Sequence, residues 1–298
     1  MRLKTWMVEI RAPFLLLPIV LSCIGAAMAY HEGAFDAVLF VAFTAVLVLW
    51  HITVNTLNEY YDHKLGIDEH NTRRTMFNGG TGTLQAGLLS PREVLAAAVV
   101  CFIAGTVIGL ALVVSVGLIL LPLLVLGAVF TLLYTQGFAR SMLGEVAAGL
   151  GLGFLPVLGA FMVQTGAVTL EAVLISVPSG LLTFNLLLIN EFPDVEVDIP
   201  GGRKNLVTAL GHRRAAVIYT TLMGLAYALP VAFAVLGFLP LTVVIGLAAV
   251  PFAFKAAVAA FGEFEEVSSF APGLKANVQA MLLTNTLLVV AILIAAML

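Results

Sequence analysis

The stretch from His51 to Asp68, HITVNTLNEYYDHKLGID, is where a long apolar segment becomes polar. The run before it, AVLFVAFTAVLVLW, favours one continuous helix, and at about 100° per residue the polar side chains that follow fall on one side of that helix. These side chains are His51, Asn55, Asn58, Glu59 and Asp62. Gly66 is expected to end the helix. Asp68, Arg73 and Arg74 follow in the loop.

A second stretch, NEFPDVEVDIPGGRK from Asn190 to Lys204, repeats this plan. Its polar members are Asn190, Asp194, Asp198, Arg203 and Lys204. In both copies an Asn precedes the first Asp by four residues, and a basic pair begins five residues after the last Asp. The repetition predicts a duplicated helical unit whose two acid sites meet across a central cavity.

The composition excludes an ordinary soluble domain. The chain has 298 residues, 61% of them hydrophobic and 10% charged, with a mean hydropathy of +1.09. Spans of about 20 apolar residues can be placed about nine times, and in lipid such spans must be helices. They are expected near residues 13–30, 36–60, 93–115, 117–134, 143–163, 170–191, 213–236, 239–260 and 277–297. The prediction is an all-α polytopic membrane protein, with residues 1–298 as one transmembrane domain around a central cavity.

The positions of Lys and Arg predict the orientation. With nine spans and a cytoplasmic N-terminus, the cytoplasmic segments hold nearly all the basic residues, whereas the outer turns HEGAFD, SVG, QTGAVT and GFLP hold none. Both acid-rich stretches are therefore expected to face the cytoplasm, from a protein in the plasma membrane. A cleavable signal peptide is the alternative for the N-terminus, but the apolar run from Pro13 to Tyr30 is long for one.

Acidic residues that are followed by basic residues, as in both stretches, are suited to binding a diphosphate through a metal ion. Asp and Asn oxygens hold hydrated Mg²⁺, the ion bridges to phosphate oxygens, and Arg and Lys neutralise the remaining charge. Each stretch alone could instead be a solvated helix end with the basic residues of any cytoplasmic loop. The shared spacing favours the functional interpretation. Cys23 and Cys101 lie in apolar spans and fit small buried hydrophobes rather than a disulfide.

The segments NTLNEYYDHKLGID and NEFPDVEVDIPGGRKNL resemble the two Asp-rich motifs of the UbiA superfamily of intramembrane prenyltransferases. Two further segments, FNGGTGTLQAGLLSPREV and LGEVAAGLGLGFLPVLGAFMVQTG, resemble the branch of 1,4-dihydroxy-2-naphthoate prenyltransferases of menaquinone synthesis. The resemblance extends from the first span to about Gly211. It implies an allylic cation formed from a prenyl diphosphate and attacked by an electron-rich ring.

The site residues follow from the motifs and this resemblance. Metal ligands are expected at Asn58, Asp62, Asp68, Asp194 and Asp198, and the four Asp residues with Tyr134 are expected to be catalytic. Substrate binding is expected at His51, Asn55, Asn58, Arg73, Arg74, Arg140, Asn190, Arg203 and Lys204. Many members have Asp where this chain has Glu59, so a ligand role for Glu59 stays open. Arg140 is a candidate for the acceptor's carboxylate, or a cytoplasmic anchor of the helix.

The predicted function is Mg²⁺-dependent transfer of a polyprenyl group to a small aromatic acceptor, first of all 1,4-dihydroxy-2-naphthoate. Other acceptors of the superfamily are alternatives: 4-hydroxybenzoate, homogentisate, a chlorophyll precursor or a glycerol-phosphate lipid. An ion-coupled secondary transporter is an alternative from another class, although its acids would lie near the bilayer midplane. The expected partners are polyprenyl diphosphate, the acceptor and the lipid bilayer, with no nucleic acid. Prenyl chain length, the number of Mg²⁺ ions and the oligomeric state stay open.

Overall fold

The computed structural model describes residues 2–67, 79–262 and 267–298. All regular secondary structure within these ranges is helical, which confirms the predicted all-α class. Among the described residues, eight helices are long and apolar enough to cross a membrane: Ala12–His31, Ala37–Lys64, Pro91–Val116, Gly144–Thr165, Leu170–Asn190, His212–Val235, Leu241–Ala260 and Ser269–Ala295. The remaining predicted span is a shorter apolar helix, Leu118–Leu133, which at about 1.5 Å per residue falls short of the hydrocarbon thickness of about 30 Å.

The elements follow one another in this order. The first half contains α1 (Arg2–Glu9), η1 (Ala12–Leu15), α2 (Leu16–His31), α3 (Ala37–Lys64), α4 (Pro91–Val116), η2 (Leu118–Leu120), α5 (Leu121–Leu133) and η3 (Phe138–Arg140). The second half contains α6 (Gly144–Gly149), η4 (Leu150–Phe154), α7 (Leu155–Thr165), α8 (Leu170–Asn190), α9 (Val195–Asp198), α10 (Leu206–Leu210), α11 (His212–Val235), η5 (Leu241–Ala249), α12 (Val250–Ala260) and α13 (Val267–Ala295).

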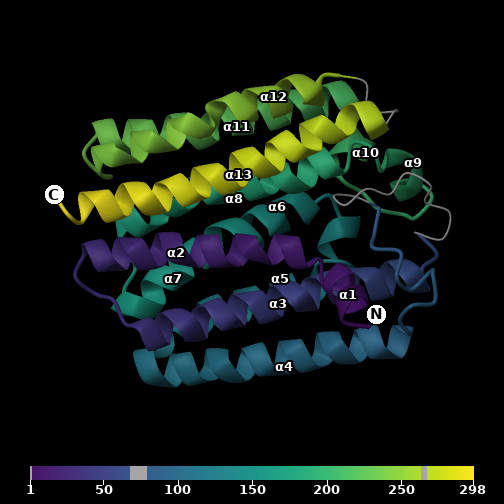
Figure 1. The fold of residues 1–298 in the computed structure, drawn as a ribbon, viewed down its shortest axis with the longest axis horizontal. Coiled ribbons are helices and arrows are strands. Elements are labelled where there is room, and N and C mark those ends of the chain that lie inside the picture. The colour runs from purple at the N-terminus through teal and green to yellow at the C-terminus, as the bar shows by residue number, and fades with distance from the viewer. Residues whose placement is uncertain (1, 68–78, 263–266) are drawn as a thin grey trace.

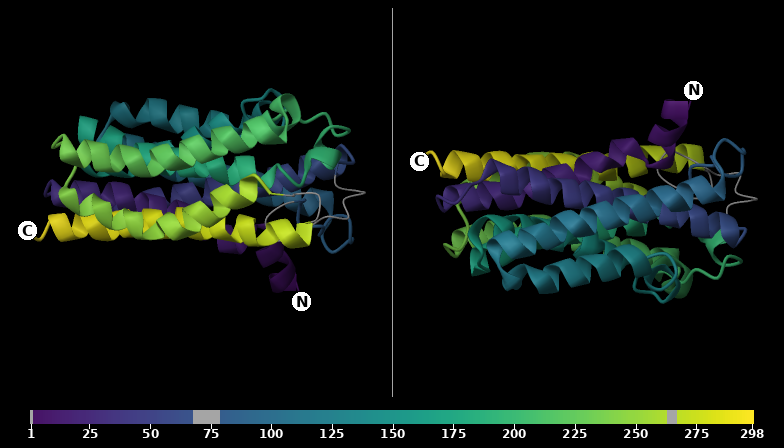
Figure 2. Two further views of the ribbon diagram at one scale, coloured as in Figure 1. Left: turned by 90° about the horizontal axis from the view of Figure 1, so that it is seen from above. Right: turned by 90° about the horizontal axis from the view of Figure 1, so that it is seen from below.

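The long helices run side by side, and the short helices α1, α9 and α10 lie at one end of the bundle (Figure 1). Figure 1 shows α1, α9 and α10 at the same end, with the C-terminus at the opposite end, and Figure 2 shows this arrangement from two further sides. Across the bundle α4 packs on α3, α2 packs on α7 and α13, and α8 packs on α11. Both acid-rich stretches therefore leave the bundle at the end that holds α1, α9 and α10.

Local sequence signals set the ends of the helices that carry these stretches. Asp36 caps the start of α3, where its carboxylate accepts hydrogen bonds from the backbone N–H groups of Val38 and Leu39 at 2.7 and 3.0 Å. The helix ends just before Gly66, whose φ of 69° suits glycine. Asp62 therefore stands in the last turn of α3, as the sequence predicts. The helix α8 ends at Asn190, and after Pro193 the chain forms the single turn α9.

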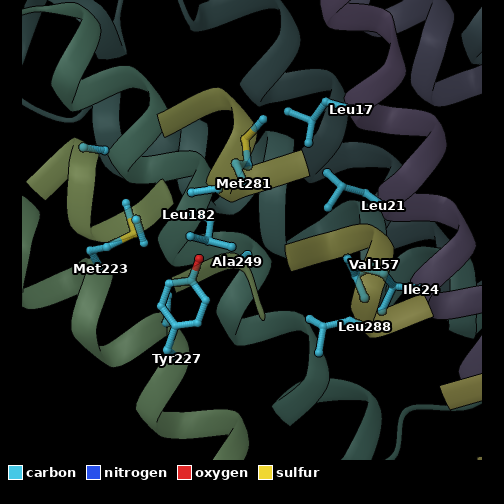
Figure 3. Close-up of a cluster of buried hydrophobic side chains, with 14 of the residues drawn as sticks. Leu17, Leu21, Ile24, Val157, Leu182, Met223, Tyr227, Ala249, Met281 and Leu288 are labelled. Atoms are coloured by element: carbon cyan, nitrogen blue, oxygen red, sulfur yellow. The ribbon is translucent and has the colours of Figure 1, made fainter. Parts of the chain in front are cut away.

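The larger hydrophobic core lies between α2, α7, α8, α11, α12 and α13. Figure 3 shows Leu17, Leu21 and Ile24 of α2 near Val157, with Met281 and Leu288 of α13 beside them. Polar pairs also join these helices: Ser179 Oγ donates to Asn285 Oδ1 at 2.7 Å, Tyr219 Oη donates to Asn277 Oδ1 at 2.7 Å, and Tyr227 Oη and Thr284 Oγ1 lie 2.8 Å apart. Hydrogen bonds between membrane helices add stability where lipid offers no partner. Buried polar contacts thus join α13 to both α8 and α11.

The contact between α2 and α7 depends on Gly25. A Cβ atom at this position would lie 2.1 Å from the carbonyl oxygen of Val157 and 2.7 Å from the Cβ atom of Ala160. Gly25→Ala is therefore expected to destabilise the protein by about 3 kcal/mol, because the two backbones must separate. Gly224→Ala is the matched control, since nothing lies within 4 Å of its added Cβ atom. Thermal unfolding in detergent measures both, and equal midpoints would contradict the packing described here.

Candidate active site

A cavity lies where the two acid-rich stretches meet. Its empty space is about 1140 Å³, part of it open to the outside. Its walls come from the start of α2, the polar face of α3, the end of α5, the helix α8 and the segment that follows α8. Among the predicted site residues, His51, Asn55, Asn58, Asp62, Tyr134, Asn190, Asp194, Asp198 and Arg203 line it.

Arg203 joins the acids of the two stretches. Its guanidinium Nη2 donates to Asp62 Oδ2 in a short ion pair, and its Nη1 lies 3.7 Å from Asp198 Oδ1. Asn205 donates its side-chain N–H to Asp198 Oδ2 at 2.8 Å while capping the start of α10. The end of α3 and the segment after α8 are thereby held in one arrangement. This contact connects residues 141 positions apart in the chain.

Two side-chain oxygen atoms of the predicted site residues have no hydrogen-bond partner among the described residues. They are Asp62 Oδ1 and Asn190 Oδ1, and both are buried. A buried polar atom without a partner is rare in proteins and often marks the place of a ligand, an ion or a water molecule. Both residues line the cavity, so a bound species is the expected partner of these oxygens.

Two carboxyl groups that follow the end of α8 have strongly raised pKa values. Burial raises the pKa of Asp198 to about 7, against the opposing effect of Arg203. Burial together with the nearby carboxyl of Glu145 raises the pKa of Glu191 well above its usual range. Burial and then Glu191 raise the pKa of the Tyr134 hydroxyl. These directions describe a crowded acidic cavity in which added positive charge is stabilised.

The donor set fits Mg²⁺ shared with a substrate. Among the described residues, no three His, Cys, Asp or Glu side chains converge closely enough to hold a metal ion by themselves. Asp62, Asp194 and Asp198 instead line the walls of one cavity, with the amide of Asn58 beside them. Mg²⁺ usually keeps several waters and is bound by one or two carboxylates plus phosphate oxygens of the substrate. Dispersed hard oxygen donors with an unpartnered Asp62 oxygen match that mode.

Glu59 has a different role from the neighbouring acids. Its Oε1 accepts from Arg11 Nη2 at 2.7 Å, and its Oε2 accepts from the backbone N–H and the hydroxyl of Thr81, both at 2.9 Å. Thr81 and Thr83 also donate to Glu9 at the end of α1. Glu59 therefore joins the N-terminal segment to α3 and to the segment before α4, and it does not line the cavity.

Substitution of Glu59 separates this joining role from metal binding. Glu59→Gln is expected to lower the stability by about 2 kcal/mol, because the buried ion pair with Arg11 is lost. The apparent Mg²⁺ affinity is expected to stay within about threefold of the unsubstituted protein, since both Glu59 oxygens already have protein partners. Thermal unfolding and Mg²⁺ titration of turnover measure the two effects. A large rise in the Mg²⁺ requirement at unchanged stability would instead make Glu59 a ligand.

Several predicted site residues do not reach the described cavity. Arg140 Nη2 donates to the carbonyl oxygen of Gly201 at 2.9 Å, and Arg140 lies outside the cavity lining. Lys204 is exposed, and its carbonyl oxygen accepts from the N–H of Met142 at 2.9 Å. These contacts attach the segment after α5 to the segment after α9. Asp68, Arg73 and Arg74 lie outside the described residues.

Two charged residues of the cavity are absent from the sequence prediction. Arg11 precedes the first span, where the sequence presents it only as a cytoplasmic positive charge, and Glu191 follows Asn190 directly. Arg11 has φ 52° and ψ 51°, a left-handed conformation that is uncommon outside glycine. Glu191 could have been predicted from its position within the second acid-rich stretch. No sequence signal distinguished Arg11 from an ordinary anchoring residue.

A second, apolar cavity adjoins the first. It has about 750 Å³ of empty space and shares His51 and Leu152 with the acidic cavity. Leu152 belongs to η4, a π-helical turn between α6 and α7, and such turns frequently occur at functional sites. Trp50 closes one wall, stacked on Phe102 with ring centroids 5.7 Å apart. The arrangement offers an elongated apolar substrate a space directly behind the acids.

Comparison with known proteins agrees with this geometry. The 1,4-dihydroxy-2-naphthoate octaprenyltransferase of Bacillus subtilis is 30% identical over 207 residues, which cover 68% of this chain and 65% of that protein, just under two thirds of its length. The Escherichia coli protein of the same name is 26% identical over 302 residues, covering 98% and 96% of the two chains. A solved UbiA homolog from Archaeoglobus fulgidus bound to DMAPP and Mg²⁺ has a TM-score of 0.67 at 13% identity, over 95% of this chain and 99% of that one.

The family profile extends over most of the chain. The UbiA prenyltransferase family matches residues 19–277, which include both acid-rich stretches and all the long helices except the start of the first and most of the last. The all-helical fold and the cavity between the two stretches are the structural counterpart of that match. The chain therefore belongs to the UbiA prenyltransferase family.

Proposed function

We propose that residues 1–298 form one transmembrane prenyltransferase domain that transfers a polyprenyl group from its diphosphate to an aromatic acceptor with the help of Mg²⁺. The observation that carries the proposal is the ion pair of Arg203 with Asp62 and Asp198, which joins the two acid-rich stretches at a cavity that adjoins an apolar one. These acids lie at the ends of helices, unlike the midplane sites of secondary transporters.

The acidic cavity is the donor site in this proposal. Asp62, Asp194 and Asp198 hold the metal, with Asn58 as a further oxygen donor, and Arg203 donates hydrogen bonds to the diphosphate. Bound Mg²⁺ supplies positive charge that stabilises the diphosphate as it leaves. The prenyl tail enters the apolar cavity past His51 and Leu152.

The proposed reaction breaks the bond between the allylic carbon and the diphosphate oxygen, and the electron pair leaves on the diphosphate. An electron-rich ring carbon of the acceptor then forms the new carbon–carbon bond. Loss of a proton or of carbon dioxide from the ring restores its aromatic character. The Tyr134 ring lines the cavity near these acids and is placed to stabilise the cation through its face. Arg203 stabilises charge that grows on the leaving group, which lowers the barrier rather than only aiding binding.

The proposed acceptor is 1,4-dihydroxy-2-naphthoate. The names of the Bacillus subtilis and Escherichia coli relatives support this choice, because both are octaprenyltransferases of that acceptor. Purified protein with Mg²⁺, labelled prenyl diphosphate and a panel of acceptors tests it by product mass. The expected product has the mass of the prenylated naphthoate minus carbon dioxide. Transfer to 4-hydroxybenzoate alone would move the chain to another acceptor class.

We also propose that the cavity opens toward the cytoplasm from the plasma membrane. The support is the distribution of positive charge, which is dense around the acid-rich stretches and absent from the outer turns. A variant lacking Cys23 and Cys101 would carry one new cysteine, at Gly201 or at Gly33. We expect a membrane-impermeant thiol reagent added outside cells to label the Gly33 variant only. Labelling of the Gly201 variant would reverse the orientation.

A further inference from the structure

Two cationic side chains line the described part of the acidic cavity, and they have different surroundings. Arg203 lies between the acids of the two stretches, through its contacts with Asp62 and Asp198. Arg11 comes from the N-terminal segment and forms an ion pair with Glu59, which is outside the cavity lining. Its side chain is only 26% exposed. The cavity therefore has a second cationic side chain, which lies beside Glu59 rather than beside Asp62 and Asp198.

Contacts with α3 place Arg11 farther from the C-terminal end of α3 than Asp62 is. The carbonyl oxygen of Ile10, next to Arg11, accepts from Asn55 Nδ2 at 3.0 Å, and Arg11 itself contacts Glu59. Asn55 and Glu59 precede Asp62 by about one to two helical turns, which corresponds to roughly 5 to 10 Å along the axis. Arg11 is thus placed beside the path from the acids toward the apolar cavity. A second substrate must lie there to reach the allylic carbon.

The walls around Arg11 suit an aromatic ring. Phe14, Leu17 and Val54 line the same cavity from η1, α2 and α3. Flat apolar surfaces favour a ring, whereas a cation at its edge favours an anionic substituent. An acceptor carboxylate would be repelled by the acids near Asp62, so its charge is best accommodated away from them.

We propose that Arg11 binds the carboxylate of the aromatic acceptor, with the ring against Phe14. This inference rests on the proposed function and names the residue that selects a carboxylated acceptor. The planar guanidinium carries several N–H donors in a fork whose geometry matches a carboxylate. The bonds of Glu59 to Thr81 fix the position of Arg11. The N-terminal segment is then part of the acceptor site.

Equilibrium binding without prenyl diphosphate tests this assignment. The probes are 1-hydroxy-2-naphthoate and 1-naphthol, which differ by the carboxylate. Unsubstituted protein is expected to bind the naphthoate more tightly, and Arg11→Met is expected to weaken its binding about ten- to a hundredfold while leaving the naphthol unchanged. Arg11→Lys should retain part of the difference. Arg92→Met, an exposed cation outside the cavity lining, is the matched control.

A second variant controls for loss of folding in Arg11→Met. Arg11→Met leaves the buried Glu59 without its ion pair, so Arg11→Met combined with Glu59→Gln removes both charges and should show the same selective loss. Equal weakening of both probes, or no preference for the naphthoate in unsubstituted protein, would overturn the proposal. So would a raised KM for prenyl diphosphate at unchanged naphthoate binding, which would assign Arg11 to the donor. Failure of the proposed function is distinct, because it would appear as no transfer by unsubstituted protein, whereas the binding comparison needs no turnover.

Discussion

Asp62→Asn and Asp194→Asn are each expected to reduce prenyl transfer at least about a thousandfold. The substitution keeps the size of the side chain but removes the negative charge that holds the metal, and Mg²⁺ relies on only one or two protein carboxylates. The lost charge stabilisation acts on the leaving diphosphate, and a thousandfold corresponds to about 4 kcal/mol in the barrier. Asn at position 62 still offers Arg203 a hydrogen-bond acceptor. The folded structure should therefore persist.

The measurement is turnover of purified variants at saturating substrates, together with thermal unfolding. Glu171→Gln in the first turn of α8, at the opposite end of that helix from Asn190, is the control and should keep normal turnover. A loss smaller than about tenfold at either Asp would show that the acids do not hold the metal of the reaction. A loss that follows unfolding would show a structural role instead.

The substitution Arg203→Met is expected to have the second large effect, on both turnover and stability. We expect turnover to fall at least about a hundredfold, because diphosphate loses its charge-assisted hydrogen bonds from this residue. The metal-free variant should also be less stable by about 3 kcal/mol, since the buried carboxylates of Asp62 and Asp198 lose their shared partner. Bound Mg²⁺ would replace the positive charge that Arg203 provides beside Asp62 and Asp198. It should therefore raise the unfolding midpoint of the variant more than that of the unsubstituted protein.

Unfolding midpoints with and without Mg²⁺, and turnover of the same preparations, test this pair of effects. Lys275→Met is the control, because Lys275 is an exposed cation on α13 outside the cavity lining. If Mg²⁺ stabilised both proteins equally, Arg203 would not share the site of the metal. Normal turnover of the Arg203 variant would remove it from the donor site.

The sequence predicted the parts of the fold that depend on local patterns. The polar face of α3 and its end before Gly66 follow from helical periodicity and from the helix-breaking glycine. The repeated spacing in the second stretch indicated that Asp194 and Asp198 would lie near Asp62. The structure places all three on one cavity. Short-range rules suffice here because each helix determines where its own last turn lies.

The parts that the sequence did not reveal depend on contacts between distant segments. The packing of α1 against α3 gives Arg11 its place in the cavity, and that packing depends on Glu59 meeting Thr81. Arg140 illustrates the opposite case, since its guanidinium binds the Gly201 carbonyl instead of entering the cavity. A cation near a helix end has the same sequence pattern in both cases. Only the tertiary fold distinguishes an anchor from a site residue.

The central claim is that the ends of α3 and α8 bind one prenyl diphosphate through Mg²⁺, and its most direct test is transfer by the purified protein in Mg²⁺ and in EDTA. Labelled prenyl diphosphate and 1,4-dihydroxy-2-naphthoate are the substrates, and the readouts are labelled product and released diphosphate. The account predicts both in Mg²⁺, neither in EDTA, and full recovery when Mg²⁺ is restored. Substantial transfer in EDTA would contradict it.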